Sequence, residues 1–139
     1  MNRRMMFLVL GALAGLTACA GASTTPEPRP DDPGPIEPGW ERGPVYVDSA
    51  EVLRKESHPV QATLLVLGSL PTPCHRIAWD VAGPTKEGRI EVSLYSLTNP
   101  ELACIQVLES FEQSIPLGSF TEGEFEIVLN GDVIGDIQI

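Results

Sequence analysis

The sequence predicts an all-β fold, an antiparallel β-sandwich of about seven strands with one disulfide. Residues 45–139 hold 42 hydrophobic residues among 95, which is enough for one core of modest stability. These residues recur mostly with period two, in short runs that turn residues separate, as is typical of a sandwich. Two cysteines in this range, Cys74 and Cys104, allow one intramolecular bridge.

Seven strands account for the alternating runs. Apolar residues on both faces of residues 63–67 indicate that the second strand is central in its sheet. The expected ranges are, in order, Val45–Arg54, Pro59–Leu67, His75–Val81, Arg89–Ser96, Glu109–Leu117, Gly123–Leu129 and Val133–Ile139.

Between the fourth and fifth strands, Asn99-Pro100-Glu101 has the composition of a helix start. We expect a short helical turn through Cys104. The alternative is a helix over residues 100–112, since four apolar residues are spaced for one helix face: Leu102, Ile105, Leu108 and Phe111.

Asn130-Gly131 predicts a tight turn between the last two strands. A two-residue loop would place Leu129 opposite Asp132 and mix the two faces. A three-residue loop over residues 130–132 instead pairs the apolar sets, because register follows the buried face. The resulting pairs are Leu129 with Val133, Ile127 with Gly135, and Phe125 with Ile137.

Residues 1–18 are organised like a signal peptide. Two arginines and no acid precede the apolar stretch 7–16, which is shorter than the roughly 20 residues of a membrane span. The following Leu16-Thr17-Ala18-Cys19 resembles the bacterial lipobox. This resemblance implies cleavage before Cys19, diacylglycerol on its sulfur and often acylation (palmitate) of its amine. The alternative is an ordinary secretory signal.

Lipidation at Cys19 implies that the lipid bilayer is a partner, because two or more acyl chains hold a protein stably on a membrane. We therefore expect a lipoprotein of the bacterial cell envelope, with its domain facing the periplasm or the exterior. Ala20 after the cysteine resembles the form that is directed to the outer membrane in Gram-negative bacteria.

Residues 19–44 follow as a lipidated cysteine and a Pro-rich, disordered tether. Residues 20–44 contain seven prolines and four glycines, a composition that cannot form a core. Such a chain extends up to ~3 Å per residue as a spacer, although a Pro-rich ligand for a partner domain is the alternative. Trp40 marks the point where the chain begins to touch the domain.

The net charge of −10 is unevenly distributed, with nine acids and no base after Arg89. This balance excludes nucleic acid as a partner. In the predicted register Glu126 faces Asp136, and Glu124 lies beside them as part of a candidate acidic binding face. Opposed carboxylates destabilise a hairpin unless a cation or a basic partner lies between them. A solvated acidic surface is the simpler interpretation.

With Cys19 lipidated, we expect Cys74 and Cys104 to form a disulfide, while a redox-active or metal-binding thiol is the alternative. A zinc site is not expected, since the adjacent Cys74 and His75 would point to opposite strand faces, and His58 is expected on the surface. The sequence has no G-x-S-x-G, Gly-rich phosphate loop or H-E-x-x-H motif. We therefore expect no enzyme, no catalytic residues, no metal and no cofactor.

Several segments resemble a family of bacterial lipoproteins and secreted modules. These segments are Leu70-Pro-Thr-Pro-Cys-His75, Ala103-Cys104, Phe111-Glu-Gln-Ser-Ile-Pro-Leu117 and Gly123-Glu-Phe-Glu-Ile-Val-Leu-Asn-Gly131. The resemblance implies an immunoglobulin-like sandwich over about residues 45–139 with the Cys74–Cys104 bridge, and it implies no activity.

The function that we expect is a non-enzymatic, membrane-anchored module with a binding or envelope-structural role and an unidentified protein or envelope partner. The alternative is a protease inhibitor that acts through the loop 70–74, which two prolines make rigid and a disulfide would hold. The sequence lacks the signature loops of the cysteine-protease inhibitors with this architecture.

Overall fold

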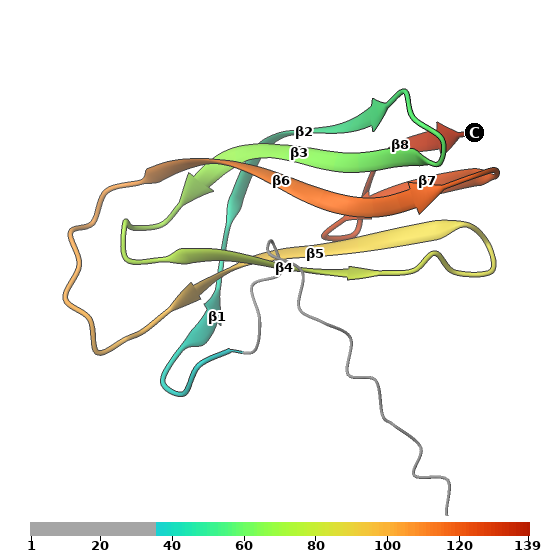
Figure 1. Ribbon diagram of the computed structural model, residues 1–139. Helices are drawn as coiled ribbons and strands as arrows, with labels where there is room; N and C mark the ends of the chain where they lie inside the picture. The colour runs from blue at the N-terminus through green and yellow to red at the C-terminus, as the bar shows by residue number, and fades with distance from the viewer. Residues whose placement is uncertain (1–35) are drawn as a thin grey trace, which may run out of the picture.

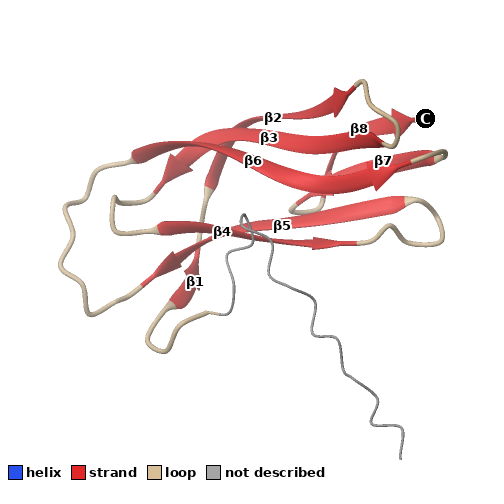
Figure 2. Ribbon diagram, in the orientation of Figure 1, coloured by secondary structure: helices blue, strands red, loops and turns tan. Residues whose placement is uncertain are grey.

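Eight strands form two packed sheets in the computed structural model, which describes residues 36–139 (Figure 1). The described part contains strands and loops but no helix (Figure 2). The strands are β1 (Glu41–Gly43), β2 (Tyr46–Lys55), β3 (Val60–Leu70), β4 (Arg76–Ala82), β5 (Arg89–Thr98), β6 (Glu109–Phe120), β7 (Glu124–Leu129) and β8 (Asp132–Gln138).

One sheet has five strands and is organised around β5. Strand β4 pairs along one edge of β5, whereas β7 and β1 share its other edge, β7 opposite residues 89–92 and β1 opposite residues 96–98. Strand β8 follows β7. The second sheet has the order β2-β3-β6, so β3 is central, as the apolar residues on both of its faces predict.

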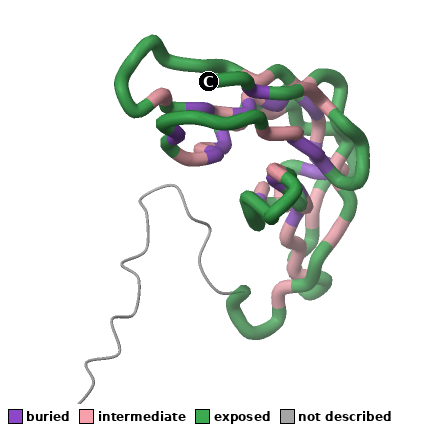
Figure 3. The backbone as a smooth tube through the Cα atoms, turned by 90° about the vertical axis from the view of Figure 1, so that its right-hand side faces the viewer, coloured by how far each residue is buried: buried purple, intermediate pink, exposed green. Residues whose placement is uncertain are grey.

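The core lies between the two sheets, and buried residues alternate with more exposed ones along β3 and β5. Figure 3 shows the buried positions in purple. Strand β3 contributes Ala62, Leu64 and Val66, and β5 contributes Ile90, Val92 and Leu94, all at most 3% exposed. The remaining buried members of this core are Ile115, Leu117, Phe120, Ile127, Leu129 and Ile137.

The predicted sandwich is confirmed, and the seven predicted strands correspond to β2 through β8. An eighth strand, β1, lies in the range 19–44 that the sequence assigns to the tether, so the folded part begins before residue 45. The pairing is also not wholly antiparallel, since β5 and β7 run parallel. After β5 the chain runs through the second sheet as β6 and then reverses. Strand β7 therefore runs in the same direction as β5.

Neither the helix over residues 100–112 nor the turn through Cys104 forms. Asn99 caps a single turn, its Oδ1 accepting the Glu101 N–H at 3.0 Å and its carbonyl accepting the Leu102 N–H at 3.1 Å. The chain is then irregular up to residue 108. Phe111 belongs to β6, opposite Gly68, where the absence of a side chain leaves room for its ring.

The tip of the last hairpin differs from the expected three-residue loop. Asn130 and Gly131 have φ values of 50° and 93°, as a two-residue type I′ turn requires. Leu129 therefore pairs with Asp132 rather than with Val133, and Val133 is 61% exposed instead of facing the core.

A β-bulge at Ile134 then restores the expected register. Ile127 pairs with Gly135, and Phe125 pairs with Ile137, as predicted. Local turn chemistry thus decides the tip, and the extra residue of the bulge returns the apolar side chains to the buried face.

Candidate functional site

The predicted acidic face lies on the outer side of β7 and β8. Glu126 is opposite Asp136, as predicted, and Glu124 is opposite Gln138. Arg89 of β5 is the parallel partner of Glu126, and its Nη2 lies 2.9 Å from the Glu126 carboxylate. The chain thus supplies its own cation beside the facing carboxylates. This pair was not predicted, because it depends on the parallel pairing of β5 and β7.

An open groove of about 830 Å³ runs along the same face. No group of three or more potential metal-ligating side chains occurs among residues 36–139. The groove is lined by Thr85, Glu87, Arg89, Glu91, Glu124, Glu126, Val133, Gly135 and Asp136. The groove is therefore an acidic surface that contains one guanidinium, that of Arg89.

The loop 70–74 is turned partly into the protein. Thr72 is 5% exposed. Its Oγ1 lies 2.8 Å from Nδ1 of His75, and its carbonyl accepts the His75 N–H at 3.1 Å. Of these five residues, Pro73 alone is classed as exposed. This part of the chain does not present the extended, exposed segment that a peptide-binding cleft takes up.

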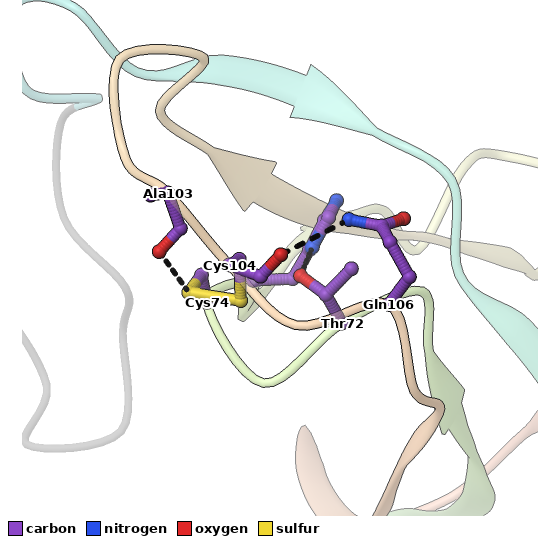
Figure 4. The surroundings of a disulfide bond; sticks show 6 residues. Thr72, Cys74, Ala103, Cys104 and Gln106 are labelled. Carbon is purple, nitrogen blue, oxygen red and sulfur yellow. Dashed lines mark hydrogen bonds between the residues drawn. A yellow bond between two sulfur atoms is a disulfide. The ribbon is translucent and has the colours of Figure 1, made fainter.

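The Cys74–Cys104 disulfide is confirmed, with 6.0 Å between the two Cα atoms (Figure 4). It joins the β3–β4 loop to the loop between β5 and β6. On the second loop, Nε2 of Gln106 donates to the Cys104 carbonyl at 3.3 Å. The disulfide therefore holds the middle of a ten-residue loop that has no strand pairing of its own.

We call residues 99–108 the apolar loop. Its exposed large hydrophobic side chains are Leu102 (49% exposed), Ile105 (67%), Val107 (50%) and Leu108 (65%). Single exposed hydrophobic residues are ordinary, but four within seven residues form a patch of the kind that marks an interaction site. Leu102, Ile105 and Leu108 are spaced for one face of the alternative helix, so their exposure was not predicted.

The N-terminal segment of the described chain packs on the five-stranded sheet. The Arg76 guanidinium stacks 3.9 Å above the Trp40 ring and lies 3.6 Å from the Glu37 carboxylate. Arg42 in turn stacks 3.9 Å above the Tyr95 ring. Its Nη2 lies 2.9 Å from the Asp80 carboxylate. Trp40 is thus in contact with the domain, as predicted.

This segment also brings the start of the described chain beside the apolar loop. Glu41 pairs with Thr98, the residue before the loop. A Cβ atom placed on Gly39 would lie 3.9 Å from Nδ2 of Asn99, the first residue of the loop. The chain therefore enters the domain at the end that carries the disulfide and the four exposed apolar side chains.

The matched family model decides the relationship of the chain to known proteins. Residues 64–139 match the ORF11 β-sandwich domain, which is more than half of the 139 residues. The chain belongs to the ORF11 β-sandwich family. No curated protein and no solved structure matches it.

The match to the ORF11 β-sandwich domain begins within β3 and includes both cysteines, the apolar loop and the acidic face. Both candidate surfaces therefore belong to the family domain, whereas β1 and β2 precede the matched range. The finer assignment to an immunoglobulin-like sandwich stays a prediction.

The predicted signal peptide, Cys19 and most of the predicted tether lie outside the described residues. Within residues 36–139 no helix has the length and apolarity to cross a membrane. Cys19 lipidation and membrane location thus stay predictions, as does the role of Glu124, Glu126 and Asp136 as a binding face.

Proposed function

We propose that this chain is an exported lipoprotein that is anchored through the lipid on Cys19 and displays its sandwich as a non-enzymatic binding or envelope-structural module. The lipobox-like segment 16–19 supports the anchor. The Pro-rich residues that follow support a spacer between membrane and domain. The binding surface in this proposal is the apolar loop.

One observation carries the binding role. Leu102, Ile105, Val107 and Leu108 expose about half or more of their surface on a loop that a disulfide holds in place. Exposed aliphatic surface of this density lowers solubility, and patches of this kind mark interaction sites, so a partner that covers the loop best explains its exposure.

The geometry favours this loop over the loop 70–74 of the protease-inhibitor alternative. At that site the central Thr72 is buried and bonded to His75. A protease that bound there would have to unfold the turn first. The disulfide partner of Cys74 instead lies within the apolar loop, which is the more accessible of the two.

The anchor is tested by expressing the full chain in a bacterial host that is supplied with an alkyne analogue of palmitate. We expect the protein to incorporate the label and the Cys19→Ser variant to lose it. The matched control is the double variant Cys74→Ser/Cys104→Ser. It should keep the label, because in the parent protein these two cysteines form a disulfide and carry no lipid. Label that persists in Cys19→Ser would contradict the anchor.

A further inference from the structure

We infer that the apolar loop inserts into the surface of the lipid bilayer that holds the Cys19 anchor, at the boundary between headgroups and acyl chains. The inference rests on the proposed lipid anchor and identifies the partner of the proposed binding surface. The partner of the apolar loop is a zwitterionic lipid surface.

The apolar loop lies at the end of the domain where the tether joins it. The chain enters the domain beside the loop, since Gly39 neighbours Asn99 and β1 pairs with the last residues of β5. Sixteen residues lie between Cys19 and Ile36, which allows at most about 50 Å of reach at ~3 Å per residue. The C-terminus and the β4–β5 loop lie at the opposite end of the sandwich (Figure 1). The tether thus joins the domain at its apolar end, so the apolar loop is the part of the domain that lies nearest to the point of attachment.

The exposed side chains of the loop suit acyl chains better than they suit a protein surface. The exposed residues are Leu, Ile and Val, with no Trp, Tyr or Arg among residues 99–108. Protein-binding hot spots are enriched in Trp, Tyr and Arg, and Leu and Val are under-represented there. Four aliphatic side chains are also too few for a stable protein interface, which needs about 800 Å² from each partner. Acyl chains require only apolar area and no specific hydrogen bonds.

The charges around the loop select the kind of lipid. The nearby Arg76 and Arg42 are already paired with Glu37 and Asp80. Glu101 lies within the loop, Glu109 directly follows it and Glu41 lies on the neighbouring segment. Anionic headgroups would repel these carboxylates, because the surface potential of an anionic leaflet attracts bases and repels acids. A zwitterionic surface carries no such penalty.

The test uses the mature protein as its bacterial host produces it, reconstituted into phosphatidylcholine vesicles with brominated acyl chains, which quench tryptophan on contact. Two variants are compared with the parent, which already contains Trp40 and Trp79. Ile105→Trp places the probe on the loop, and Val133→Trp places it at a similarly exposed position (61%) in the acidic groove. We expect Ile105→Trp to lose fluorescence relative to vesicles without bromine, and Val133→Trp to lose no more than the parent.

A second substitution checks that insertion itself causes the loss. Adding Leu108→Asp to Ile105→Trp places a charge beside the probe, and we expect it to restore the fluorescence. Vesicle flotation is measured on every sample, so that anchoring and loop contact are read separately.

The protein could float with the vesicles while Ile105→Trp shows no more quenching than Val133→Trp. That result would refute contact between the loop and the bilayer and would favour a protein partner for the apolar loop. Protein that does not float refutes the lipid anchor, and the inference falls with it. Restored fluorescence in the Leu108→Asp variant supports insertion, and unchanged quenching there contradicts it.

Discussion

The side chain of Asn130 completes one edge of β5, and its removal should destabilise the domain. Strand β7 pairs with β5 up to Val92, and β1 pairs from Ser96 onward. Between them, Oδ1 of Asn130 accepts the Leu94 N–H at 2.8 Å, and its Nδ2 donates to the Leu94 carbonyl at 3.0 Å. The carboxamide therefore takes the place of a strand residue in the ladder.

Asn130→Gly isolates the contribution of these two hydrogen bonds. Glycine adopts the φ of 50° at this position without strain. Each intramolecular hydrogen bond contributes about 0.5–1.5 kcal/mol net, so the two together contribute about 1–3 kcal/mol to the free energy of unfolding. Because Asn130 itself is exposed, water can replace part of this loss, and we expect the lower half of that range. Asn130→Ala should cost about 1 kcal/mol more, since alanine disfavours positive φ.

The assay is urea denaturation followed by tryptophan fluorescence, with the free energy of unfolding obtained by linear extrapolation. Asn99→Gly is the matched control, because its Oδ1 accepts one hydrogen bond, from Glu101, in an exposed turn. We expect that control to lose less than about 0.5 kcal/mol, as is usual for surface substitutions. If Asn130→Gly is no less stable than Asn99→Gly, the role of the carboxamide in the sheet is refuted.

Three further outcomes are expected. The Cys74→Ala/Cys104→Ala variant should lose about 3.6 kcal/mol of stability for a loop of 30 residues, measured by the same urea titration; an unchanged midpoint would contradict this. Arg89→Met should destabilise the domain by less than about 1 kcal/mol, because its pair with Glu126 is half exposed, and the loss should shrink in high salt; a salt-independent loss would argue against an ionic cause. Gly68→Val should prevent a stable fold or cost at least about 2 kcal/mol, because its Cβ would overlap the Tyr46 carbonyl oxygen, and circular dichroism during thermal unfolding would show it.

The strands could be predicted because burial imposes a period of two on sequences as short as seven residues. Strand β1 could not, because Glu41–Gly43 contains no apolar alternation. Its place depends on side-chain contacts with residues that are distant in the sequence, such as Arg42 with Asp80. The hairpin shows a conflict between two local rules, in which the Asn-Gly turn decides the tip and burial decides the rest.

The candidate surfaces were predictable only in part. The opposed Glu126 and Asp136 follow from register alone, whereas the neutralising Arg89 depends on a parallel pairing that no short-range pattern encodes. The disulfide follows from cysteine count. The exposure of Ile105 and Leu108 does not, since their spacing is compatible with a buried helix face until Phe111 is seen to join β6.

The pairing of β5 has a consequence for how the chain matures. The edge of β5 at residues 89–92 is covered by β7, and the gap at Leu94 is closed by Asn130. Both partners come from the last 16 residues. A chain that emerges from the ribosome or crosses a membrane with its N-terminus first therefore carries an open strand edge until residues 124–130 appear, and open edges are templates for aggregation. Pairing between strands that are distant in the sequence also forms slowly, which prolongs the exposure of this edge during folding.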